Sequence, residues 1–258
     1  MPKIFDLIRL GAALYEERLK PVVVLLLIQI VVYFLFGAVN AVSTLSMSVF
    51  GVSGMALVVL GVLALIYAAF WLEVAFLRAF SDREELVIVR GLFARSRPQV
   101  FPFLWVSFLT LSAVLGVIVL IVAFGFGGVL LFGKGIAAAE TVLGVLVALM
   151  ATVFLMTRLV FANWIVVLDR ARGFAALGES IRLTRGLFWP VFRRVFGLSL
   201  IMGGITLVLQ AFSVLLLGQY GSILTQLMSM FVLTPTYTAA TLFLYRSVAT
   251  EIPSDAHP

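Results

Sequence analysis

Six long apolar stretches constrain this chain more than any other feature. About 20 apolar residues cross the hydrocarbon core of a bilayer as a helix. The expected spans are residues 21–42, 52–77, 99–124, 139–166, 191–217 and 222–245. Backbone polar groups in lipid must be bonded within the segment, and the alternating pattern of a membrane barrel is absent. The sequence therefore predicts an all-α, polytopic membrane bundle with about six transmembrane helices.

Composition indicates one transmembrane domain without a separate soluble domain. The chain is 63% hydrophobic and 12% charged, whereas soluble domains are usually about 45–50% apolar and about 25% charged. We expect a single transmembrane domain over residues 1–250 and a flexible tail over residues 251–258. The N-terminal residues lack the apolar core of a signal peptide, so the first span is expected to act as an uncleaved insertion signal.

The sequence lacks the residue types that an intramembrane serine protease or metalloprotease would normally need. There is no cysteine, which excludes disulfides, thiolate nucleophiles and cysteine-ligated metal centres. The one histidine is His257, close to the C-terminal end of the sequence, so no Ser–His pair is expected within the spans. We expect no catalytic residues, no cofactor and no metal, and therefore a protein that is not an enzyme.

The basic residues predict the orientation of the spans. Of the 18 lysine and arginine residues, all but Lys134 fall on one side of the predicted spans. By the positive-inside rule, both termini are expected to be cytoplasmic. The tryptophans agree, because all four fall at cytoplasmic ends of spans, where indole rings favour the headgroup zone. They are Trp71, Trp105, Trp164 and Trp189. The predicted location is the cytoplasmic (inner) membrane of a bacterium.

Three segments on the basic side have the pattern of amphipathic interfacial helices. They cover residues 3–19, 82–97 and 173–188, where apolar side chains share one helical face and charged ones the other. The tetrapeptide Arg-Gly-Leu-Phe occurs at 90–93 and again at 185–188. This pattern predicts three units, each an amphipathic helix followed by a hairpin of two spans. Common ancestry of the units and chance matching of short motifs are both left open.

Residues 169–189 are similar to a known family. They contain an acidic residue and a glycine, then Ala-Leu, Ser, Leu-Thr-x-Gly and Phe-Trp, just after a span. This pattern resembles the membrane domain attached to some glycerophosphoryl diester phosphodiesterases, and related stand-alone bacterial membrane proteins of unknown function. Residues 235–246 resemble that family's last helix. The resemblance implies a multi-pass fold but no reaction, because the family's phosphodiesterase activity belongs to a separate soluble barrel.

Charged residues in apolar spans are costly and suggest function. Glu73 in the second span and Arg158 in the fourth form a candidate intramembrane polar pair. The alternatives are a structural lock, two side chains that reach the interface independently, or a polar site for an ion or lipid headgroup. In the last span, Pro235 predicts a helix kink, because proline removes a helical hydrogen bond. The kink would either only set the shape of the helix or act as the hinge of a moving helix.

A cluster of arginines is the best candidate for contacts with lipid headgroups. Its members are Arg170, Arg172, Arg182, Arg185, Arg193 and Arg194. Anionic lipids attract such side chains by about 1 kcal/mol each. We therefore expect membrane lipids, chiefly anionic phospholipids, as partners. Apolar residues interleaved with the arginines argue against nucleic acid. A homo-oligomer or a membrane-protein partner is compatible with the sequence.

Two classes of function fit these features. The first is a non-catalytic multi-pass protein that acts as a lipid-associated scaffold, regulator or sensor at the inner leaflet. The second is a transporter or permease for a lipid, peptide or small solute, with Glu73, Arg158 and the Pro235 kink along its path. An enzyme acting on lipids is a third alternative.

Overall fold

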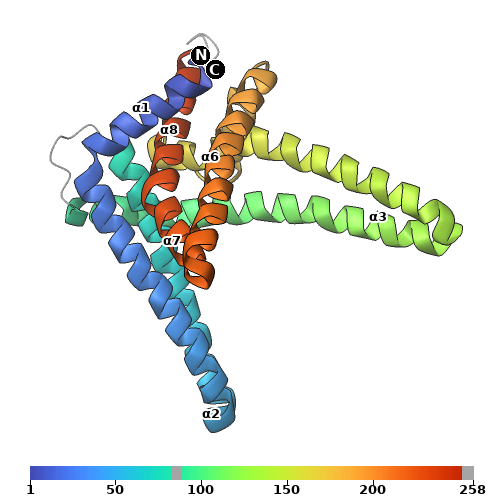
Figure 1. The fold of residues 1–258 in the computed structure, drawn as a ribbon, viewed down its shortest axis with the longest axis horizontal. Helices are drawn as coiled ribbons and strands as arrows, with labels where there is room; N and C mark the ends of the chain where they lie inside the picture. Colours follow the sequence, from blue (N-terminus) through green and yellow to red (C-terminus); the bar gives the residue numbers. More distant parts are fainter. Residues whose placement is uncertain (83–88, 252–258) are drawn as a thin grey trace. The chain divides into compact units, whose positions relative to one another are not determined.

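The computed structural model describes residues 1–82 and 89–251, and the secondary structure of this part is entirely helical (Figure 1). Six helical segments are long and apolar enough to cross a membrane. They are Leu19–Val39, Val58–Ser81, Val89–Val117, Leu149–Leu168, Phe188–Leu217 and Gly221–Glu251. Each overlaps one predicted span, so the predicted all-α fold with six membrane-spanning helices is confirmed. The chain is a multi-pass membrane protein by helix length and hydropathy.

Contacts between residues divide the chain into two compact units, each of which is described by itself. The first unit comprises Met1–Phe101 and Arg194–Pro258, and the second comprises Pro102–Arg193. Two long helices, α3 (Val89–Leu159) and α6 (Phe188–Leu217), contribute residues to both units.

The first unit is built around α2 (Leu19–Ser81), which contains two of the six spans. In Figure 1 this helix turns back on itself, from blue to cyan, so that its two arms lie side by side. A side chain added at Gly61 would contact Val39 at 4.0 Å. The backbone stays helical through this reversal, although the sequence predicts a connector between the spans 21–42 and 52–77. No proline occurs in this connector to force the backbone out of helical geometry.

The predicted amphipathic helix at residues 3–19 is present as α1 (Ile4–Glu17), and it packs on α8 (Thr234–Glu251). A Cβ atom at Gly11 would lie 2.7 Å from the carbonyl oxygen of Thr236 and 2.9 Å from the backbone nitrogen of Ala240. The two backbones thus touch where the helices cross, as small residues allow between membrane helices.

A tight reversal joins α6 to the last span. A short 3-10 helix, Gly218–Tyr220, leads into α7 (Gly221–Met228). Gly218 has a positive φ of 57°, which favours glycine. A Cβ atom at Gly221 would overlap the backbone of Ser213, so glycine is required there too. After α7, a π-helical turn, Ser229–Leu233, continues into α8.

The second unit contains most of α3, then α4 (Ala162–Leu168), α5 (Phe174–Leu183) and the first residues of α6. The helix α3 also doubles back, from green to yellow in Figure 1. The core of this unit includes Phe161 and Ile165, both fully buried. Trp164 is only 4% exposed, so the structure places this predicted headgroup anchor inside the protein.

The other two predicted amphipathic segments have different outcomes. The segment 173–188 forms α5, which ends at Leu183 because a turn containing Gly186, with φ of 81°, precedes α6. Of the segment 82–97, residues 83–88 lie outside the described residues, and the part from Val89 onward is the first stretch of α3. The described part is therefore continuous with the third span. The predicted tail at 252–258 also lies outside the described residues.

Candidate functional site

Four of the six candidate arginines are exposed, and all four belong to the second unit. These exposed arginines are Arg170, Arg172, Arg185 and Arg193. Over the described part of the chain, their side chains make no hydrogen bond or ion pair. Three of them lie in the turns that flank α5, and Arg193 lies near the start of α6. Their charges are therefore available to a ligand or a surface.

Arg182 differs from the exposed arginines because it is already paired. Its Nε donates to Oε2 of Glu179 at 2.9 Å, and its Nη2 donates to Oε1 of the same residue at 2.6 Å. The hydrogen bonds and the negative charge of Glu179 raise the pKa of Arg182. This bidentate pair between residues three apart on α5 leaves little net charge at position 182.

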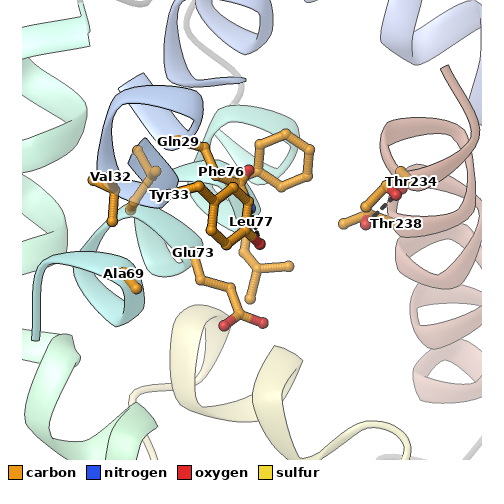
Figure 2. A pocket seen from close by; sticks show the side chains of 10 residues that line it. Gln29, Val32, Tyr33, Ala69, Glu73, Phe76, Leu77, Thr234 and Thr238 are labelled. Carbon is orange, nitrogen blue, oxygen red and sulfur yellow. Dashed lines mark hydrogen bonds between the residues drawn. The ribbon is translucent and has the colours of Figure 1, made fainter. Parts of the chain in front are cut away.

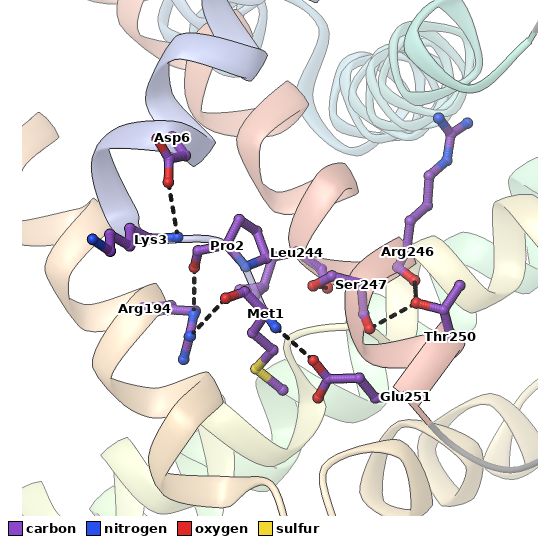
Figure 3. A network of polar contacts seen from close by, with 10 residues as sticks. All are labelled: Met1, Pro2, Lys3, Asp6, Arg194, Leu244, Arg246, Ser247, Thr250 and Glu251. Atoms are coloured by element: carbon purple, nitrogen blue, oxygen red, sulfur yellow. Dashed lines mark hydrogen bonds and ion pairs between the residues drawn. The ribbon is translucent and has the colours of Figure 1, made fainter.

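Arg194 belongs to the first unit and holds the N-terminal segment against α6 (Figure 3). Its Nε donates to the carbonyl oxygen of Pro2 at 2.8 Å, and its Nη2 donates to that of Met1 at 3.3 Å. The amino group of Met1 in turn lies 2.6 Å from Oε1 of Glu251. The Arg194 guanidinium is thus engaged by backbone carbonyls, unlike the exposed arginines.

Exposed aromatic side chains accompany the exposed arginines. Phe174 at the start of α5 is 72% exposed, and Trp189 at the start of α6 is 64% exposed. The Trp189 ring lies edge-on to the rings of Phe188 and Phe192, with centroids 5.5 and 5.6 Å away. Aromatic rings and arginines prefer different solvents, and the headgroup zone of a membrane suits both.

Arg158, near the end of α3, has its contacts within the second unit. Its guanidinium carbon lies 5.2 Å from the ring centroid of Phe154 and 5.5 Å from that of Phe188, within the range of cation–π attraction. Its Nη1 lies 3.5 Å from both the Ile181 carbonyl and the Thr184 hydroxyl. A cation is favoured beside these last carbonyls of α5. These contacts support the structural-lock interpretation of Arg158.

Glu73 lies on the second arm of α2, in the first unit. It lines a cavity of about 220 Å³ between the two arms of α2 and the start of α8. Figure 2 shows Gln29 and Tyr33 on one arm of α2 and Glu73 on the other, with Thr234 and Thr238 apart from them on α8. Because Glu73 and Arg158 belong to different units, their pairing stays a prediction.

The cavity wall on α8 follows an irregular turn. Pro235 has no N–H group to bond the carbonyl of Phe231, four residues earlier, and the backbone is π-helical over Ser229–Leu233. The hydroxyl of Tyr15 on α1 donates to this carbonyl at 2.5 Å. Burial raises the pKa of Tyr15, which keeps the hydroxyl protonated as a donor. The structure therefore adds Tyr15, which the sequence did not single out.

Comparison of the chain with protein-family models, with curated proteins and with solved structures gives no match. Within residues 1–82 and 89–251, no group of three or more metal-ligating side chains is brought together. The candidate sites are the exposed arginines of the second unit and the cavity beside Glu73 in the first.

Proposed function

We propose that this protein is a non-catalytic membrane module that associates with anionic lipid headgroups through the exposed arginines. The observation that carries the proposal is the combination of these arginines with the exposed rings of Phe174 and Trp189. In water the rings would be poorly solvated, and deep in lipid the arginines would be costly. Only the interfacial zone suits both kinds of side chain.

The charge distribution supports a position at the inner leaflet of a bacterial membrane. That leaflet is rich in anionic lipid, and each arginine near such a surface contributes about 1 kcal/mol. The four exposed arginines therefore provide an attraction that a neutral bilayer would not. The positive-inside pattern of the whole sequence favours the same orientation, with both termini cytoplasmic.

The experiment compares two arginines of one short segment. The full chain is purified in a neutral detergent, and binding of a short-chain phosphatidylglycerol is measured by fluorescence quenching or native mass spectrometry. We expect Arg185→Gln to weaken binding about fivefold, as loss of about 1 kcal/mol implies. The matched control is the double variant Glu179→Gln/Arg182→Gln, which removes an ion pair and leaves the net charge unchanged, and it should change binding by less than about twofold.

Two results would count against this proposal. Equal effects of Arg185→Gln and the double variant Glu179→Gln/Arg182→Gln would mean that the unpaired charge of Arg185 does not matter. Binding that does not weaken as salt increases would mean that the attraction is not electrostatic. We also propose that residues 169–189 share the fold of the phosphodiesterase membrane domain that they resemble.

A transporter is the second candidate function, because the cavity beside Glu73 lies next to an irregular span. Glu73 lines the cavity, and the π-helical turn Ser229–Leu233 is an irregularity in the span that forms part of its wall. The test is uptake of a labelled lipid or solute by proteoliposomes containing the full chain. Uptake that Glu73→Gln abolishes would favour the transporter over the lipid-binding module.

A further inference from the structure

We propose that the cavity beside Glu73 is a binding site for the ammonium group of an organic amine. The site lies within the first unit and is lined by both arms of α2 and by α8. This inference does not rest on the exposed arginines, which belong to the second unit.

Charge is the first argument. Glu73 is the one acidic or basic residue among those that line the cavity. In the described residues of its own unit, no lysine or arginine forms an ion pair with its carboxylate. A charged group within an apolar span is costly unless it has a partner. A cationic ligand supplies that partner, whereas an anion would be repelled.

Two other polar side chains in the cavity lining can accept a hydrogen bond from an N–H donor. Gln29 donates from Nε2 to the Tyr33 hydroxyl at 3.2 Å, which leaves the amide oxygen of Gln29 able to accept. Thr238 donates its hydroxyl proton to the carbonyl of Thr234 at 2.9 Å, so its oxygen also keeps its lone pairs. An ammonium group carries several N–H donors and no acceptor, which matches this arrangement.

The lining favours an organic cation over a metal ion. Calcium and magnesium take six or more oxygen ligands, usually with more than one carboxylate, and Glu73 is alone here. The rings of Tyr33 and Phe76 line the same cavity, and aromatic rings attract ammonium groups. Val32 and Leu72 add apolar surface for methylene or methyl groups.

The size of the cavity limits the ligand. Its volume of about 220 Å³ is smaller than the roughly 300–1,000 Å³ of sites for drug-sized ligands. It fits a headgroup rather than a whole lipid. The same chemistry has two sources: a small amine from solution, and the amine headgroup of a membrane lipid whose acyl chains remain in the bilayer.

The experiment uses one probe for each source with the full chain in neutral detergent. Ethanolamine binding is measured by calorimetry, and retention of phosphatidylethanolamine against phosphatidylglycerol is measured by native mass spectrometry. We expect at least one amine probe to bind the native protein. Glu73→Gln keeps the shape of the side chain and removes its charge, so it should weaken that binding about tenfold or more.

The matched control is Glu16→Gln, the same chemical change at an exposed position of α1, which should leave binding unchanged. Binding of ethanolamine alone would identify the ligand as a soluble amine. Preferential retention of phosphatidylethanolamine would identify it as a lipid headgroup. Either result supports the site if Glu73→Gln weakens the binding of that probe.

Circular dichroism checks that the Glu73→Gln variant is folded. If it is not, Thr238→Val replaces it and should weaken binding about threefold through loss of one acceptor.

Three outcomes would overturn the proposal. The first is that neither amine probe binds the native protein. The second is that the folded Glu73→Gln variant, or Thr238→Val in its place, binds as tightly as the native protein. The third is that Glu16→Gln weakens binding as much as the cavity variant does.

Discussion

The Tyr15 hydroxyl donates a hydrogen bond of 2.5 Å to the backbone carbonyl of Phe231. The bond joins α1 to the π-helical turn Ser229–Leu233. It is made to the carbonyl that Pro235 cannot bond, because proline has no N–H group. A residue of the amphipathic helix thus supports the backbone of the last span at its irregular point.

We predict that Tyr15→Phe destabilises the protein by roughly 1–3 kcal/mol, because the substitution leaves a partly buried carbonyl without its donor. The measurement is unfolding in detergent by a denaturant, followed by circular dichroism. Tyr220→Phe is the matched control, since Tyr220 is exposed at the turn before α7, and it should have no measurable effect. Equal stability of the Tyr15→Phe variant and the native protein would show that the hydrogen bond contributes nothing.

Tyr15 also makes the stability of the folded protein depend on pH. The pKa of Tyr15 is raised above its usual value of 10.0 by burial, so the folded protein favours the protonated phenol. Its contribution should be fully present below about pH 10 and lost as the pH rises through the higher pKa of the folded state. The stability difference between native protein and Tyr15→Phe is therefore expected to be constant from about pH 6 to pH 9. A difference that declines within this range would contradict the assignment.

A side chain at the crossing of α1 and α8 should separate the two helices. Gly11→Ala would place a Cβ atom 2.7 Å from the Thr236 carbonyl oxygen, and relief of such overlap costs roughly 1–3 kcal/mol. Gly37→Ala is the control, because nothing lies within 4 Å of a Cβ atom there. Alanine favours helix over glycine, so this control should be neutral or stabilising. Protease sensitivity of the N-terminal segment and thermal unfolding measure both variants.

A double-mutant cycle tests the predicted pair between Glu73 and Arg158. Arg158 already contacts Phe154, Phe188 and the end of α5, so we expect Arg158→Gln to destabilise the protein on its own. We expect the effects of Glu73→Gln and Arg158→Gln to add within about 0.5 kcal/mol. A larger coupling energy would instead support a direct pair between the two side chains.

The spans were predictable because lipid sets a minimum length for an apolar helix. Burial within the protein was not predictable, since hydropathy does not distinguish a side chain that faces lipid from one that faces another helix. Trp164 shows the difference, because its position at the end of a span predicts a headgroup anchor and the structure buries it. The helix that begins at Val89 shows a second limit, since it continues through Pro98, where the sequence predicts that a separate amphipathic helix ends.

The candidate site was predictable only in part. The spacing of Glu179 and Arg182 is that of a helical ion pair, so the pairing of Arg182 could have been predicted. The bond between Tyr15 and Phe231 could not, because it depends on how α1 lies across α8. The sequence indicated only that the carbonyl of Phe231 would lack its usual helical donor, because this residue lies four positions before Pro235.

The π-helical turn also sets the rotational register of the last helix. Each residue of an α-helix turns the chain by about 100°, so one residue more or less in Ser229–Leu233 would rotate all of α8 by about that angle. A single deletion there would carry Thr234 and Thr238 out of the cavity wall and move Ala240 away from Gly11. The length of this turn is therefore as much a constraint on the protein as the identity of any side chain in it.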